Sequence, residues 1–288
     1  MIVNLKEILE IGERQFMAVG AFNTPHMESL RATIDAAEQL NLPVIVQFAQ
    51  VHESWTPLEY MAPIMIKAAA EASVPVCVHL DHGETLEYIQ KALDLGFTSI
   101  MYDGSVLPFE ENIANTKKAV EMATMRGASV EAELGSMGKR ESGSGDADPQ
   151  DNAQKVYTDP NQARQFVEET GITALACSFG TTHGLYKSAP QLNFDIVREV
   201  RRLANNIPVV MHGGSGVSFE DYRKAVAAGV RKINYFTYMD KAGGTAMAGY
   251  LESRKTDDPK FFTPISLAGL DAMKENVSAA MKVFALQG

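Results

Sequence analysis

Hydrophobic residues along this chain gather into short runs that alternate with longer amphipathic stretches. The runs are apolar at consecutive positions, as is typical of parallel strands that are covered on both faces. We predict strands at residues 18–22, 43–48, 75–80, 99–102, 129–134, 173–179, 208–212 and 232–236. Helical spacing of apolar residues predicts helices at 27–40, 60–72, 84–95, 110–126, 160–170, 194–204 and 219–228. The chain therefore alternates strand and helix throughout.

Helix boundary signals fall where this alternation needs them. Asp159 followed by Pro160 is an N-cap with proline in the first turn, and glycines such as Gly171 and Gly229 stand where helices should end. Eight such β–α units predict an α/β fold, a TIM (β/α)8 barrel that occupies residues 1–288 as a single domain. Two segments interrupt the pattern. The polar, glycine-rich stretch 135–159 is expected to be a lid or linker. The tail 239–288 predicts a C-terminal helical extension whose last helix, about 265–286, packs on the barrel or on a partner subunit.

Composition narrows the class of protein. The chain has 288 residues, 45% of them hydrophobic, which is enough for a large core. Its net charge of −10 argues against a nucleic-acid or anionic-membrane partner. Cys77 and Cys177 lie in apolar runs, so we expect no disulfide and a reducing compartment. There is neither a signal-peptide pattern nor an apolar stretch long enough to span a membrane. We therefore expect a cytoplasmic protein.

Histidines follow three of the predicted strands. The active site of a TIM barrel is built at the C-terminal ends of its strands. His82, His183 and His212 come just after the third, sixth and seventh strands. Three imidazoles with one open position form the usual catalytic zinc arrangement. The sequence therefore predicts a zinc site at the barrel mouth.

Other polar residues near these strand ends have less certain roles. Asp81 should point away from His82 in a regular strand, and we interpret it as a proton-transfer group, with ligand orientation as the alternative. Glu133 is either a metal ligand or enediolate stabiliser, or a member of a salt bridge. His79 either hydrogen-bonds a residue of the metal site and so orients it, or has only a packing role in the core. His52, at a loop-to-helix junction, is interpreted as structural.

A phosphate pocket is predicted after the last two strands. Glycines let backbone amides approach a phosphate closely, and the following helix N-terminus favours the anion. Barrels of this kind place their phosphate site at this position. The predicted pocket comprises Gly213, Ser215, Asn234 and Thr237, completed by Gly184 and Lys187.

Taken together, these motifs resemble the class II (zinc-dependent) ketose-bisphosphate aldolases, above all their fructose- and tagatose-bisphosphate branch, over about residues 20–284. The motifs that carry the resemblance are Gly20-Ala-Phe-Asn23, His79-Leu-Asp-His82, Glu131-Ala-Glu-Leu-Gly135, Tyr157-Thr-Asp-Pro160, Gly180-Thr-Thr-His-Gly184 and His212-Gly-Gly-Ser-Gly216. The resemblance implies cleavage of fructose or tagatose 1,6-bisphosphate, or a related ketose 1-phosphate, to dihydroxyacetone phosphate and an aldehyde. A homodimer or homotetramer is the family expectation.

The resemblance also implies roles for individual residues. The zinc ligands would be His82, His183 and His212, with Glu133 near the metal, and Asp81 would transfer the proton of the C4 hydroxyl. Glu141 matches a position implicated in proton exchange on dihydroxyacetone phosphate, and Asn23 matches a substrate-contacting asparagine. The pocket for the triose phosphate would be formed by Gly184, Gly213, Ser215, Asn234 and Thr237, with Na⁺ or K⁺ beside it.

Three departures from the family pattern fall on the aldehyde half of the site. Tyr235 and Phe236 are bulkier than usual. Lys260 stands where many relatives have an arginine for the distal phosphate, and lysine lacks the bidentate fork. Residues 48–50, Phe-Ala-Gln, replace a serine-containing turn. The aldehyde partner and a second phosphate are thus left open.

Alternatives to the zinc aldolase are also open from sequence. A Schiff-base mechanism needs a lysine in the barrel centre; the strand at 173–179 has none, and Lys232 is expected at the wrong end of its strand. A metal-dependent sugar-phosphate epimerase would use a similar barrel. A non-catalytic aldolase-like subunit is a third possibility, but the three histidines and Asp81 favour an active aldolase.

Overall fold

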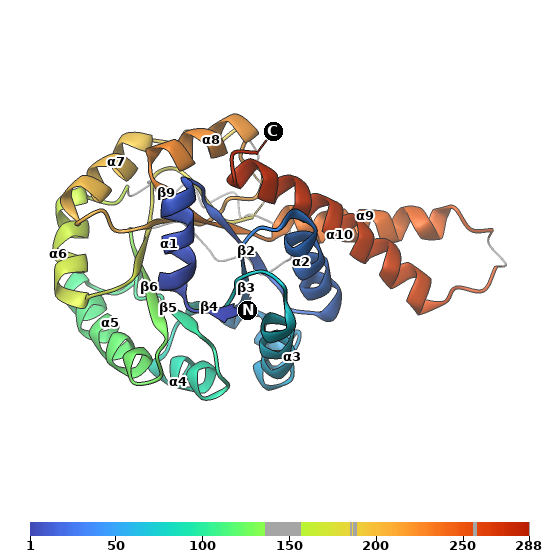
Figure 1. The fold of residues 1–288 in the computed structure, drawn as a ribbon, viewed down its shortest axis with the longest axis horizontal. Coiled ribbons are helices and arrows are strands. Elements are labelled where there is room, and N and C mark those ends of the chain that lie inside the picture. The colour runs from blue at the N-terminus through green and yellow to red at the C-terminus, as the bar shows by residue number, and fades with distance from the viewer. Residues whose placement is uncertain (136–156, 185, 187–188, 256–257, 288) are drawn as a thin grey trace.

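The computed structural model describes residues 1–135, 157–184, 186, 189–255 and 258–287 (Figure 1). Within these residues eight parallel strands run in sequence order, and the ring closes because the last pairs with the first. The strands are β2 (Val19–Asn23), β3 (Val44–Ala49), β4 (Val76–Gly83), β5 (Ser99–Tyr102), β6 (Ser129–Leu134), β7 (Ala174–Cys177), β8 (Val209–Met211) and β9 (Val230–Tyr235). The predicted TIM barrel is confirmed. A two-residue strand, β1 (Ile2–Val3), adds to β4.

Helices surround the barrel as an outer ring (Figure 1). They are α2 (Met27–Leu40), α3 (Leu58–Glu71), α4 (Leu86–Asp94), α5 (Phe109–Thr124), α6 (Pro160–Thr170), α7 (Phe194–Leu203) and α8 (Phe219–Ala228). Their starts follow from local chemistry: the Asp159 side chain accepts from the N–H groups of Asn161 and Gln162 at the start of α6. At their ends, Gly171 and Gly229 adopt the left-handed conformation expected of helix C-caps.

One end of the barrel is closed by α1 (Leu5–Gln15), a helix that the strand pattern did not predict. Asn4 and Glu7 form a reciprocal capping box at its start. Leu5, Ile8 and Leu9 are buried against apolar residues of the strands inside the barrel. Cys77 belongs to this cluster, and both cysteines are buried and unpaired. The opposite end, where the strands have their C-termini, carries the polar residues.

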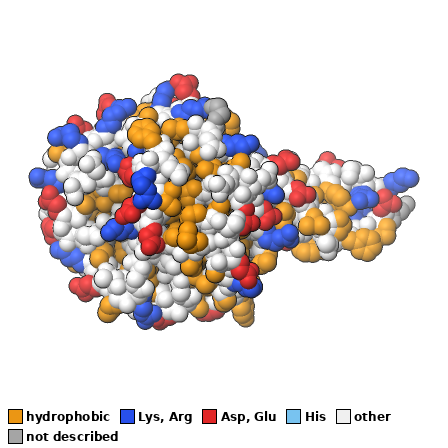
Figure 2. All heavy atoms as spheres, in the orientation of Figure 1, with side chains coloured by type: hydrophobic (Ala, Val, Ile, Leu, Met, Phe, Trp, Pro, Cys, Tyr) orange, Lys and Arg blue, Asp and Glu red, His pale blue; other side chains and the backbone are white. Residues whose placement is uncertain are grey.

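The tail forms two long helices, α9 (Thr237–Glu252) and α10 (Phe262–Phe284), that extend from the barrel as an arm (Figure 1). The ring of Phe284 packs against Tyr222 and Tyr235, at 4.9 and 6.0 Å between centroids, and ties the arm to the barrel. At the arm's tip Phe261 and Phe262 are 66% and 75% exposed, and hydrophobic side chains gather there (Figure 2). The described helices include none long and apolar enough to cross a membrane.

Candidate active site

The end of β4 has an irregular backbone that brings two neighbouring side chains to one place. Its register with β5 shifts between Leu80 and Gly83, and His82 has a left-handed φ of 46°. The prediction that Asp81 and His82 point apart is wrong, because the bulge turns both into the barrel mouth. Asp81 Oδ1 and His82 Nε2 lie 4.0 Å apart. A left-handed non-glycine residue costs about 1–3 kcal/mol and is concentrated at functional sites.

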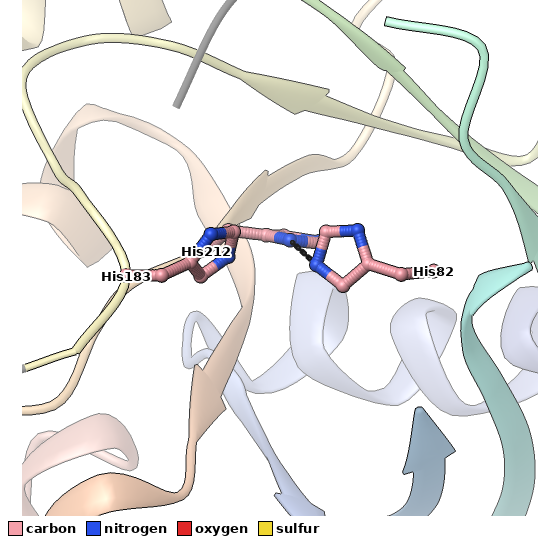
Figure 3. A group of neighbouring side chains, drawn as sticks. All are labelled: His82, His183 and His212. Carbon is pink, nitrogen blue, oxygen red and sulfur yellow. Dashed lines mark hydrogen bonds between the residues drawn. The ribbon is translucent and has the colours of Figure 1, made fainter. Parts of the chain in front are cut away.

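Three histidines converge at this mouth (Figure 3). His82 comes from β4, His183 from the segment after β7, and His212 follows β8 directly. One nitrogen from each lies within 4.8 Å of the others, and His82 Nε2 and His212 Nδ1 are 3.0 Å apart. The His183 Nδ1 atom is buried and has no hydrogen-bond partner within the described ranges. The predicted metal-ligating histidines are thus brought together.

Two carboxylates fix the orientation of the His82 and His212 rings by contacting their outer nitrogens. Asp103 Oδ2 lies 2.7 Å from His82 Nδ1, and Glu131 Oε1 lies 2.8 Å from His212 Nε2. A carboxylate accepts the ring N–H, so the proton of each neutral imidazole is held on the outer nitrogen. The inner nitrogens, 3.0 Å apart, can then either share one proton or bind one cation. Burial alone would lower the pKa of His82, but Asp81 and Asp103 raise it to about 9, so near pH 7 its Nε2 carries a proton and donates to His212 Nδ1. A metal ion would take the place of this proton.

Glu133 completes the acidic side of the site. His82, Asp103 and Glu133 form a second group whose ligand atoms lie within 4.8 Å of one another. Glu133 Oε2 is 3.9 Å from His212 Nδ1 and has no hydrogen-bond partner among the described residues. Burial, and then the charge of Asp103, raises its pKa well above the usual value. This buried carboxylate has no lysine or arginine partner in the described part of the chain, and a metal ion beside it would relieve its desolvation.

Three side-chain amides surround Asp81. Asn23 Nδ2 and Gln47 Nε2 donate to Oδ2 at 3.0 and 3.2 Å, and Asn234 Nδ2 donates to Oδ1 at 3.1 Å. Burial would raise the pKa of Asp81, but nearby positive charge, chiefly at His82, holds it well below its usual range. The site therefore contains an ionised carboxylate in a fixed orientation. Sequence reasoning missed Gln47, although an amide in the apolar run 44–49 was a signal for it.

A buried ion pair lies directly beneath these groups. Lys232 Nζ is 2.9 Å from Glu131 Oε2 and donates to Asn234 Oδ1 at 2.7 Å, and neither charged side chain is exposed. His79 Nε2 lies 3.6 Å from the same Glu131 oxygen. Lys232 lies early in β9, as expected, but one hydrogen bond connects it to Asn234, which holds Asp81. Its amine is engaged in the pair, so it does not stand free as a Schiff-base nucleophile.

The predicted phosphate residues after β8 and β9 also lie together. The Gly214 N–H donates to Asn234 O at 3.2 Å, and Ser215 Oγ accepts from the Phe236 N–H at 3.1 Å. Gly213 has φ +59°, and a Cβ there would collide with the Thr182 carbonyl oxygen. Thr237 is the first residue of α9, and Gly184 follows His183. Lys187 and Glu141 lie outside the described residues.

These groups line one cavity at the barrel mouth, and His52 lines it with them. Asn23, Asp81, His82, His183 and Asn234 contribute to its wall. His52, from the 3₁₀ helix η1 (Gln50–Ser54), is 1% exposed. Sequence reasoning assigned His52 a structural role because nothing in a loop histidine indicates which way its ring turns.

The sequence matches the family described as "Fructose-bisphosphate aldolase class-II" over residues 3–288. The chain belongs to this class II aldolase family. A fructose-bisphosphate aldolase of Staphylococcus aureus (strain Mu50 / ATCC 700699) is 37% identical over 98% of this chain and 97% of its own. The uncharacterized protein YdjI of Escherichia coli (strain K12) is 39% identical over 94% of this chain and 93% of its own.

Solved structures of this aldolase family share the fold. The crystal structure of the YdjI aldolase from Escherichia coli K12 superposes with a TM-score of 0.86 at 36% identity, covering 99% of this chain and 97% of that one. A putative fructose-1,6-biphosphate aldolase from Coccidioides immitis gives the same TM-score at 27% identity, with the same coverage. The chain is accordingly a lyase of a metal-dependent aldolase family that acts on phosphorylated ketoses. These findings favour neither an epimerase nor a non-catalytic subunit.

Proposed function

We propose that this aldolase uses zinc to cleave a phosphorylated ketose reversibly to dihydroxyacetone phosphate and an aldehyde. The substrate would be fructose or tagatose 1,6-bisphosphate or a related ketose 1-phosphate. The observation that carries the proposal is the meeting of three imidazole nitrogens beside a cavity that the ionised Asp81, His82 and His183 line. Nitrogen donors held in fixed tautomers by carboxylates are suited to zinc.

The residues that would hold the ion are His82, His183 and His212, with Glu133 beside them. The donor set fits because the inner nitrogens of His82 and His212 face each other and buried atoms of His183 and Glu133 have no described partner. Bound there, zinc would supply Lewis acidity at the substrate carbonyl. In this proposal Asp103 and Glu131 keep the histidines oriented.

Asp81 is the proposed proton carrier. Its carboxylate would accept the proton of the C4 hydroxyl while the C3–C4 bond breaks, and the electron pair of that bond stays with the triose phosphate half. In the condensation direction the same oxygen returns the proton. The amides of Asn23, Gln47 and Asn234 hold the carboxylate in place, so little reorganisation is needed when the proton moves.

The phosphate of the triose would lie against the turns after β8 and β9. This pocket is proposed to include Gly184, Lys187, Gly213, Ser215, Asn234 and Thr237, with Na⁺ or K⁺ nearby and Glu141 serving proton exchange on the triose. We further propose a cytoplasmic homodimer or homotetramer without nucleic-acid or membrane partners. The exposed phenylalanines at the tip of the α9–α10 arm support association of copies, and the unpaired buried cysteines are compatible with a reducing compartment.

Metal analysis together with an assay for dihydroxyacetone phosphate release tests the proposal. The purified protein should carry zinc and release dihydroxyacetone phosphate from at least one member of a panel of ketose 1-phosphates and 1,6-bisphosphates. A chelator should abolish turnover. Protein without zinc, or activity that a chelator leaves unchanged, would overturn the proposal.

Histidine variants locate the metal within the molecule. His183→Ala should lose both zinc and activity while it keeps the far-ultraviolet circular dichroism of the folded protein. His26→Ala is the matched control, because His26 caps α2 outside the histidine cluster and its loss should leave the zinc content unchanged. Asp81→Ala should keep zinc but lose turnover, and nearly full turnover in this variant would remove Asp81 from the proton-transfer role.

A further inference from the structure

His52 is a buried polar side chain whose nitrogens make no hydrogen bond within the described ranges. It lines the same cavity as Asp81 and His82. Neither Nδ1 nor Nε2 has a partner among the described residues, although the residue is 1% exposed. Buried polar atoms in native proteins nearly always find partners, so an exception beside a reaction site indicates a ligand.

Aromatic rings fix the plane of His52 without engaging its nitrogens. The imidazole stacks on Trp55 with 4.6 Å between ring centroids and 20° between planes. Phe236 lies 5.2 Å away, and Phe48 approaches edge-on at 6.0 Å. Trp55 is 47% exposed, so this aromatic cluster reaches the protein surface. The cluster restricts the plane of the ring and leaves its nitrogens for a ligand.

The short helix η1 that carries His52 is held on both sides of it. Gln50 Oε1 accepts the Glu84 N–H at 2.8 Å, so this side chain is used to fix the loop. Glu53 accepts from the Tyr88 hydroxyl at 2.5 Å and from Lys91 Nζ at 3.0 Å, both on α4. His52 is therefore set in position before any ligand arrives, which lowers the entropic cost of binding.

We propose that His52 hydrogen-bonds a hydroxyl group of the aldehyde half of the substrate and, with Trp55 and Phe236, forms the subsite that selects that half. The proposal rests on the proposed function, in which Asp81 acts at C4, the first carbon of the aldehyde half. His52 and Asp81 line one cavity, so a ligand that reaches Asp81 through this half passes the imidazole.

The protonation state of His52 suits a hydroxyl. Burial outweighs the nearby charges of Asp81 and Asp240 and lowers the pKa of His52 to about 4. The ring is then neutral near pH 7 and offers one donor and one acceptor, as a hydroxyl group does. The structure thus favours a hydroxylated aldehyde at this subsite.

Condensation kinetics with two aldehydes test this assignment. Dihydroxyacetone phosphate would be combined with glyceraldehyde, which has hydroxyls beyond the reacting carbon, or with propanal, which has none. His52→Phe keeps a stacking ring and removes both nitrogens. It should lower kcat/KM for glyceraldehyde by roughly tenfold or more, while kcat/KM for propanal changes by less than about threefold. His52→Gln, which again offers a donor and an acceptor, should recover part of the loss.

Hydrogen exchange on dihydroxyacetone phosphate alone supplies the internal control. His52→Phe should exchange the hydrogen next to the carbonyl with solvent at the wild-type rate, because this half-reaction involves no aldehyde. An unchanged glyceraldehyde-to-propanal ratio in His52→Phe, or an exchange rate that falls in parallel with condensation, would overturn the subsite. If the wild-type protein shows neither exchange nor condensation, the proposed function fails instead.

Discussion

Replacing Lys232 by methionine would remove the buried cation beneath the histidines while keeping most of the side-chain volume. In the folded protein Lys232 Nζ lies 2.9 Å from Glu131 Oε2, and both side chains are fully buried. With an effective dielectric constant of about 20, this separation corresponds to an attraction of about 6 kcal/mol. The variant therefore leaves a buried carboxylate without its main neutralising partner.

Protonation of Glu131 limits the loss. Burial would raise the pKa of Glu131, but Lys232 and His212 lower it to about 2, so the carboxyl is charged in the native protein. Adding a proton at pH 7 to a carboxyl of ordinary pKa costs about 3 kcal/mol, and the lost hydrogen bond to Asn234 adds about 1 kcal/mol. We expect Lys232→Met to lower the free energy of unfolding by about 3–5 kcal/mol, as for other broken buried pairs.

Equilibrium urea unfolding of the metal-free protein measures this change, with fluorescence of Trp55, the single tryptophan of the chain, as a probe. The matched control is Lys67→Met, which breaks an exposed pair with Glu71 and should cost less than about 1 kcal/mol. Glu131→Gln combined with Lys232→Met should cost less than the sum of the single changes. Equal losses in Lys232→Met and Lys67→Met, or no coupling in the double variant, would refute the reasoning.

Three further predictions concern other parts of the site. Asp103→Asn removes the charged acceptor behind His82 and should weaken zinc binding about 10–100-fold in competition with a chromophoric chelator; unchanged affinity would contradict the assigned tautomer. Burial alone would raise the pKa of Glu53, but its bonds to a tyrosine and a lysine of α4 lower it. The stability it contributes is therefore complete above pH 4.5 and is lost as pH falls through the lowered value. Glu53→Gln should flatten the pH dependence of the urea midpoint in that acidic range, and equal slopes in the two proteins would count against this. Gly213→Ala forces a side chain onto the Thr182 carbonyl at a positive φ and should cost about 1–3 kcal/mol in urea unfolding; full stability would mean that the turn relaxes.

The barrel could be predicted because its signals are local. Consecutive apolar residues mark the strands, and caps such as Asp159 with Pro160 mark helix ends, so each boundary needs only a few neighbouring residues. The rule that strand C-termini share one end then places the polar residues together without knowledge of packing. For this reason the histidine cluster could be expected from the amino-acid sequence alone.

Other features depend on contacts between distant segments, and the sequence carries no sign of them. The left-handed turn at His82 follows from how β4 meets β5, so regular alternation gave the wrong direction for Asp81. The position of Lys232 early in its strand gives no sign of its ion pair with Glu131, which comes from another strand. The ring of His52 could turn either way until Trp55 and η1 fix it.

The helix α1 closes one end of the barrel, and this limits the routes by which ligands and protons reach the site. Leu5, Ile8 and Leu9 fill one end with apolar side chains, which carry no protons. Substrate, both products and solvent protons must then pass through the same opening. In the proposed reaction, a proton taken by Asp81 stays in the site while the aldehyde occupies the exit. Reversal would then compete with release, so the rate of departure through this opening would influence how often a cleaved sugar is rejoined.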